Sequence, residues 1–111
     1  MTFTGDVDHA ALAENLQKLS TLGLAGVLAL GSTGEQPNLS EFERALVLEV
    51  SRRNLPDSMV LIAGTGLAGT RITIEETKRA AEAGADVALV VTPSYYQKAM
   101  NAPNLIAHYR A

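Results

Sequence analysis

The chain has 111 residues, 47% of them hydrophobic, and a formal net charge of −3 at pH 7. This size and composition predict one small globular domain and argue against a disordered chain. The nine basic residues are scattered, so no stripe of Lys and Arg can neutralise a nucleic-acid backbone, and nucleic acid is excluded as a partner. There is no cysteine, which excludes a disulfide framework and a thiolate metal site. We expect no metal and no other cofactor.

The start of the chain carries neither the basic nor the apolar segment of a signal peptide. The longest apolar runs are far too short to cross a bilayer, so we expect no membrane partner. These features predict a protein of the cell interior, in the cytoplasm or, if a transit peptide has been removed, in mitochondria.

The first predicted element is a helix that begins after Asp8, a suitable N-cap, and ends at Gly23, which suits a left-handed C-terminal position. Apolar side chains recur at helical spacing between these two residues. A short apolar run at residues 27–30 predicts a strand buried on both faces. The pattern Ser40-Glu41-Phe42-Glu43 is a capping box, which predicts a second helix that ends before Pro56.

The same alternation continues in the second half of the chain. Residues 60–63 and 87–91 are apolar runs that predict two further buried strands, with a helix from about residue 70 to 83 between them. Asn101 and Pro103 begin a last predicted helix. Strands that start near residues 27, 60 and 87 have the spacing of βαβ units of about 30 residues, so they should pair in parallel in an α/β fold.

Two architectures share this pattern, an open doubly wound sheet and a closed (β/α)8 barrel, also called a TIM barrel. A complete barrel needs about 250 residues. No complete strand precedes the first helix, and the last helix runs to the end of the sequence. We therefore expect one partial barrel domain over residues 1–111, with a truncated first strand and later units missing.

In both architectures, function lies at the carboxyl ends of the strands, so the loops that follow the strands are the candidate site. The first rim loop is Gly31-Ser32-Thr33-Gly34-Glu35, the second is Gly64-Thr65-Gly66, and the third is Thr92-Pro93-Ser94-Tyr95-Tyr96. The first rim loop can present N–H groups and hydroxyls to a small carboxylate or phosphate, or it can be only a tight turn that caps a helix. Glycines in the second rim loop can let its backbone pass close to a neighbouring segment.

Tyr95 and Tyr96 follow Pro93, which cannot continue a central strand, so the pair is expected on the rim. A phenol there can relay a proton or donate a hydrogen bond to a substrate oxygen. The same pair can instead pack at a subunit interface. His9 and His108 have no second ligand at metal-binding spacing, which argues against a metal site.

The rim loops, in this order, resemble the dihydrodipicolinate synthase and N-acetylneuraminate lyase family of class I aldolases. The third rim loop is most similar to that of the 4-hydroxy-2-oxoglutarate aldolase branch. The resemblance covers nearly the whole chain. Besides the three rim loops, the segments that carry it are Phe3-Thr4, Ile62-Ala63, Ala83-Gly84-Ala85-Asp86, Val91, Leu105-Ile106 and His108-Tyr109.

The resemblance implies a lyase that holds pyruvate, or a similar 2-oxo acid, as a Schiff base and makes or breaks a carbon–carbon bond. It implies a homo-oligomer, commonly a tetramer. It places Ser32 and Tyr96 in a catalytic hydroxyl relay, with Tyr96 reaching across a subunit interface. Substrate binding would fall to Thr33, Gly34 and Tyr95.

The family's Schiff-base lysine lies on the sixth barrel strand and would follow Ala111, so we expect these 111 residues alone to be inactive. Lys18, Lys78 and Lys98 lie on predicted helices or a loop, which a Schiff-base lysine rarely does. Two other hypotheses stay open. One is a truncated, non-catalytic relative that acts only by binding or subunit association. The other, a doubly wound domain that binds a phosphorylated ligand at residues 31–34, lacks the glycine fingerprint and the phosphate-loop lysine.

Overall fold

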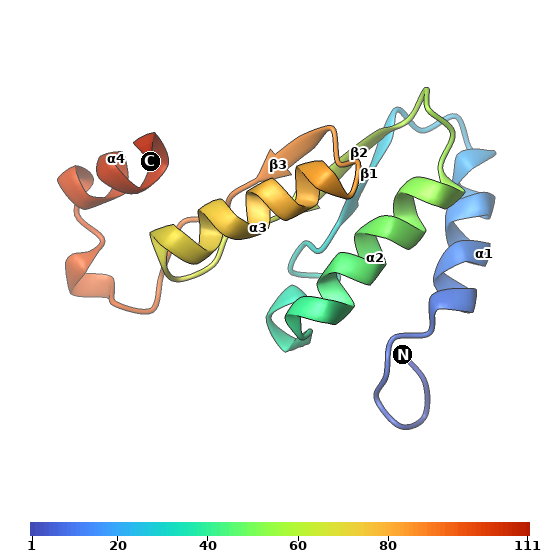
Figure 1. Cartoon of the computed structure of the whole chain (residues 1–111), viewed down its shortest axis with the longest axis horizontal. Coiled ribbons are helices and arrows are strands. Elements are labelled where there is room, and N and C mark those ends of the chain that lie inside the picture. The colour runs from blue at the N-terminus through green and yellow to red at the C-terminus, as the bar shows by residue number, and fades with distance from the viewer.

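A computed structural model describes all residues, 1–111, as a three-stranded parallel sheet with helices packed along one face (Figure 1). The strand order β1-β2-β3 follows the chain, so α2 and α3 are crossovers between neighbouring parallel strands, as predicted. Helix α4 stands apart at the end of the molecule that carries the C-terminus. The elements are α1 (His9–Ser20), β1 (Gly26–Ala29), η1 (Gln36–Asn38), α2 (Glu41–Asn54), β2 (Val60–Gly64), α3 (Thr70–Glu82), β3 (Val87–Leu89), η2 (Gln97–Ala99) and α4 (Ala102–Arg110).

The helix ends follow the local signals in the sequence. The Asp8 carboxylate accepts a hydrogen bond from the N–H of Ala11 at 3.0 Å and caps α1. Gly23, just beyond α1, has a φ of +70° and so takes the predicted left-handed conformation. At the start of α2, the Glu43 carboxylate accepts from the Ser40 N–H at 2.8 Å, and the Ser40 hydroxyl accepts from the Glu43 N–H. The predicted capping box is therefore confirmed.

The core lies between the sheet and helices α1, α2 and α3. Leu61 and Ala63 of the central strand β2 are fully buried. They pack in two clusters that include Leu16 of α1, Leu48 of α2 and Ala80 of α3. Only 18 of the 111 residues are buried, so this single layer is the whole core of the chain. No helix has both the length and the apolar character of a membrane span.

The opposite face of the sheet is uncovered. The strand register places Leu28, Ile62 and Val87 in one row across the three strands. Leu28 is 46% exposed, Val87 49%, and Leu89 50%. The prediction that all three strands are buried on both faces is therefore wrong for this chain, because its helices cover one face and no other segment packs on the second.

Strand β3 is shorter than predicted. It ends at Leu89, two residues before the predicted end at Val91. The neighbouring strand β2 ends at Gly64, and one further ladder bond, from the Thr65 N–H to the Leu89 carbonyl at 3.1 Å, closes the pairing. Beyond this point β3 has no strand partner, so the chain leaves the sheet and enters the third rim loop.

Candidate functional site

The first rim loop (residues 31–35) leaves β1 at the carboxyl edge of the sheet. The hydroxyls of Ser32 and Thr33 are exposed, and neither residue's N–H is bonded within the chain. The Gly34 N–H donates to the Gly31 carbonyl at 3.0 Å, so Gly34 closes the turn and offers no free donor. The loop therefore presents two adjacent N–H groups and two hydroxyls to solvent, a set of donors that suits an anionic oxygen.

The second rim loop (residues 64–66) is pressed between its neighbours. A Cβ on Gly64 would lie 2.0 Å from the Leu30 carbonyl oxygen, and a Cβ on Gly66 would lie 2.4 Å from the Val91 nitrogen. This confirms that glycine here allows close approach of backbones. Thr65 is 2% exposed, and its hydroxyl accepts a hydrogen bond from the Thr77 hydroxyl at 2.9 Å, so this loop is fastened to α3.

The third rim loop (residues 92–96) carries the tyrosine pair outside the sheet, as predicted. Tyr95 is 80% exposed and Tyr96 68%, and the two rings form an edge-to-face pair with centroids 4.9 Å apart. The Thr92 hydroxyl is 2.9 Å from the Tyr109 hydroxyl of α4. No hydrogen bond within the chain joins either tyrosine to Ser32 or Thr33. In Figure 1 the loop after β3 runs toward α4, away from the loop after β1.

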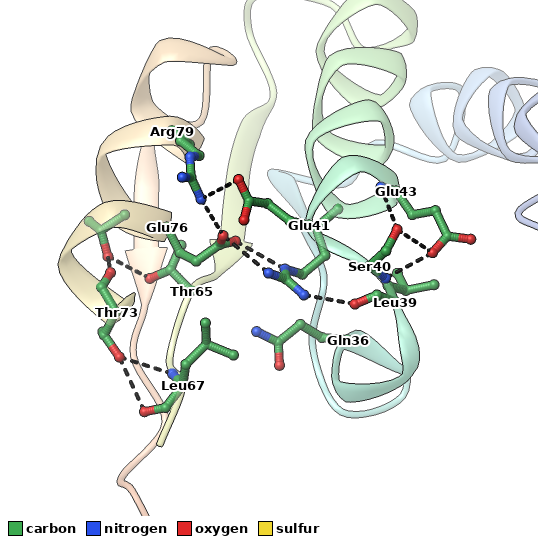
Figure 2. Close-up of polar contacts among 12 residues, drawn as sticks. Gln36, Leu39, Ser40, Glu41, Glu43, Thr65, Leu67, Thr73, Glu76 and Arg79 are labelled. Carbon is green, nitrogen blue, oxygen red and sulfur yellow. Dashed lines mark hydrogen bonds and ion pairs between the residues drawn. The ribbon is translucent and has the colours of Figure 1, made fainter. Parts of the chain in front are cut away.

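An ion pair that the sequence analysis missed joins helices α2 and α3 (Figure 2). Arg44 of α2 donates to both carboxylate oxygens of Glu76 of α3, at 3.0 and 3.1 Å. Its remaining nitrogen donates to the Leu39 carbonyl at 2.7 Å, and Arg79 also binds Glu76 at 3.0 Å. The side chains of Arg44 and Glu76 are 13% and 11% exposed. This bidentate pair ties the segment after the first rim loop to α3.

Helical spacing is the signal that would have revealed this pair. Arg44 lies three residues before Val47, and Glu76 lies four residues before Ala80, both on buried helix faces. The hydrogen bonds from Arg44 lower the pKa of Glu76 from its ordinary value, while burial opposes them. Glu76 is therefore ionised at neutral pH.

A buried amide joins the residue after the first rim loop to the second rim loop. Gln36 follows the first rim loop directly and is 7% exposed. Its Nε2 donates to the carbonyl of Gly66 in the second rim loop at 3.4 Å. The sequence analysis did not single out this residue, because one glutamine after a turn is usually solvated.

None of the three lysines is buried, and His108 binds outside the rim loops. Lys18, Lys78 and Lys98 are all exposed, and Lys18 pairs with Glu14 one helical turn away. His108 is 2.9 Å from the Thr70 hydroxyl, which joins α4 to the start of α3. No cluster of His, Cys, Asp and Glu could hold a metal ion.

Parallel βα units with polar loops at the carboxyl ends of the strands define an α/β protein of the class that includes the (β/α)8 barrels. Within that class the chain belongs to the dihydrodipicolinate synthetase family, which matches residues 1–111. The predicted resemblance and the predicted barrel-type fold are both confirmed.

Two curated relatives illustrate the range of the family. A probable mitochondrial 4-hydroxy-2-oxoglutarate aldolase of Emericella nidulans is 40% identical over 110 residues, which cover 96% of this chain and 36% of the relative. A 4-hydroxy-tetrahydrodipicolinate synthase of Stenotrophomonas maltophilia is 47% identical over 89 residues, which cover 80% of this chain and 29% of that enzyme. The chain thus spans about a third of the length of these relatives.

Solved structures show the same relation. The dihydrodipicolinate synthase of Acinetobacter baumannii, complexed with pyruvate, matches with a TM-score of 0.92 and 36% identity over 99% of this chain and 37% of that one. The synthase of Aquifex aeolicus matches with a TM-score of 0.87 and 34% identity over 95% of this chain and 35% of that one.

Proposed function

We propose that these residues form part of the substrate pocket of a Schiff-base aldolase that acts on a pyruvate-type 2-oxo acid. The observation that carries this proposal is the first rim loop, where the free N–H groups and exposed hydroxyls of Ser32 and Thr33 lie together at the carboxyl end of β1. Such donors match the oxygens of a small carboxylate. Family membership over the whole chain and the pyruvate complex of the A. baumannii relative support the substrate class.

In this proposal each rim residue has a distinct role. Thr33 binds the substrate carboxylate, and Gly34 closes the turn that presents it. Ser32 takes part in a hydroxyl relay that Tyr96 completes from a neighbouring subunit, while Tyr95 lines the pocket. The exposure of both tyrosines supports a role across a subunit interface in a homo-oligomer, which would be a tetramer in the family pattern.

The chemistry also needs a lysine amine, which condenses with the 2-oxo group to form an imine and water. The imine withdraws electrons, so loss of a proton from the adjacent carbon gives an enamine that can form a carbon–carbon bond. Lys18, Lys78 and Lys98 are exposed, whereas a Schiff-base lysine needs a desolvated position. We propose that this lysine lies outside residues 1–111, that the chain alone is inactive, and that the enzyme belongs with the 4-hydroxy-2-oxoglutarate aldolases.

Borohydride trapping tests this assignment. When the 111-residue chain is incubated with pyruvate and sodium borohydride, mass spectrometry is expected to detect no reduced adduct on any of the three lysines. A longer polypeptide that contains these residues and the lysine is expected to carry one adduct, on a lysine beyond Ala111. An adduct on Lys18, Lys78 or Lys98 would overturn the assignment.

Binding can be followed separately in the chain itself. Pyruvate is expected to shift the amide NMR resonances of Ser32 and Thr33. The shifts should be smaller in Thr33→Val, which loses the hydroxyl and keeps the side-chain shape. They should be unchanged in the control Thr21→Val, which makes the same change at an exposed residue at the end of α1.

The uncovered face of the sheet favours a second candidate function, a non-catalytic role in subunit association. Leu28, Val87 and Leu89 form an apolar surface that an isolated monomer would leave in water. If association is the function, size-exclusion chromatography should show a discrete oligomer. Leu28→Lys combined with Leu89→Lys should convert it to a monomer, and Ile106→Lys on α4, at an equally exposed residue, should not. A wild-type chain that elutes as a monomer would contradict this candidate.

A further inference from the structure

Gln36, the residue directly after the first rim loop, makes a side-chain hydrogen bond to the second rim loop. Its Nε2 donates to the Gly66 carbonyl, and the side chain is buried. Figure 2 shows the amide of Gln36 directed toward Leu67, the residue that follows Gly66. Because a buried N–H group without a partner is unfavourable, this contact favours keeping together two segments that lie 30 residues apart in the sequence.

The segment that Gln36 follows is strained. Leu30 and Glu35, which flank the turn of the first rim loop, have φ angles of +58° and +54°. The left-handed region is unfavourable for residues that carry a Cβ, above all for a bulky one such as leucine. Such conformations persist only where the surrounding structure holds them in place. Gln36 directly follows Glu35, and its buried side chain bonds to the second rim loop.

Close backbone contacts and hydrogen bonds hold the second rim loop in place. Gly64 lies against the backbone of Leu30, and Gly66 lies against the backbone of Val91. The Thr73 hydroxyl bonds to both the N–H and the carbonyl of Leu67 at 3.1 Å (Figure 2). The Gly66 carbonyl therefore has a fixed position relative to the ends of all three strands.

We propose that Gln36 is a positioning residue for the carboxylate-binding turn. Its amide holds the strained first rim loop against Gly66, so that the N–H groups and hydroxyls of Ser32 and Thr33 keep the arrangement that receives the substrate carboxylate. This inference rests on the proposed function and deepens it, since it names the group that keeps the turn ready for pyruvate.

Amide hydrogen exchange in the 111-residue chain tests the proposal with Gln36→Glu. A glutamate has the same length but, when ionised, cannot donate to the Gly66 carbonyl. At pH 7 the amides of Gly34 and Glu35 are expected to exchange about three- to tenfold faster than in the wild type. As the pH falls below about 4.3, the protonated acid can donate again. The ratio of the variant's exchange rates to those of the wild type should then return toward one. The neighbouring charges are those of Glu35 and the Arg44–Glu76 pair, and both proteins carry them.

Two comparisons separate positioning from general loss of structure. The exposed control Gln97→Glu adds the same charge and should leave the exchange of Gly34 and Glu35 unchanged. The Leu61 amide, which lies in the fully buried part of the central strand and donates to the Asp86 carboxylate at 2.8 Å, reports global unfolding. If it also exchanges faster in Gln36→Glu, the neutral Gln36→Met replaces that variant and should accelerate exchange in the loop at every pH.

The outcomes separate this inference from the proposed function. Faster loop exchange with recovery at low pH, together with weaker pyruvate-induced shifts at Ser32 and Thr33 at pH 7, would support it. Unchanged exchange at Gly34 and Glu35 in both variants would overturn it, whatever pyruvate does. Faster exchange without any pyruvate-induced shift in the wild type would instead overturn the proposed pyruvate site.

Discussion

Replacing Arg44 by methionine is expected to lower the free energy of unfolding by about 3 kcal/mol at pH 7. The substitution leaves the Glu76 carboxylate, which is 11% exposed, without its bidentate partner. Arg79 still lies 3.0 Å from Glu76, so the effect should fall at the lower end of the range for a broken buried pair. Urea unfolding followed by circular dichroism measures it.

A double-mutant cycle identifies the cause. Arg44→Met combined with Glu76→Gln removes both charges and should cost clearly less than the sum of the single variants. The control Arg53→Met removes an exposed ion pair with Glu49 on the same helix and should change stability by less than about 1 kcal/mol. Additive losses in the cycle would show that Arg44 and Glu76 do not act as a pair.

The same variant has a defined pH dependence. The Arg44 hydrogen bonds lower the pKa of Glu76 below its ordinary value of 4.5, so the pair stabilises the fold above that value and loses its contribution as the pH falls through the lowered pKa. The difference in unfolding free energy between the wild type and Arg44→Met should therefore shrink in acid. An equal difference well below pH 4.5 would contradict the ion-pair account.

Gly64→Ala is expected to cost about 3 kcal/mol, because its Cβ would lie 2.0 Å from the Leu30 carbonyl oxygen. Gly64 ends the central strand, so its backbone cannot move without disturbing pairing on both sides. Thermal unfolding measures the loss. Gly34→Ala is the matched control, since its Cβ would meet only ordinary contacts of 3.4 Å or more. Similar melting temperatures for the two variants would show that the close approach at Gly64 is not required.

Local signals in the sequence predicted the helices because their ends depend on hydrogen bonds that span three or four residues. The Asp8 cap and the Ser40–Glu43 box formed where their spacing placed them. The repeat of apolar runs about every 30 residues predicted the parallel order of the strands, since short crossovers leave few other topologies. This order places all three predicted rim loops at the carboxyl edge of the sheet.

Burial and contacts between the rim loops could not be predicted in the same way. The apolar sequence of β3 predicts a strand that is buried on both faces. Its actual exposure depends on whether another segment covers the second face. The positions of Tyr95 and Tyr96 on the rim followed from Pro93, but their separation from Ser32 within the chain did not.

For this protein, residue order determined the helix caps, the parallel βα repeat and the family resemblance, because each rests on short-range geometry or on motifs in sequence. Folding in three dimensions decided that Arg44 meets Glu76, that Gln36 reaches Gly66 and that Gly64 touches Leu30. These partners lie 30 or more residues apart, and only the parallel register and helix packing bring them together.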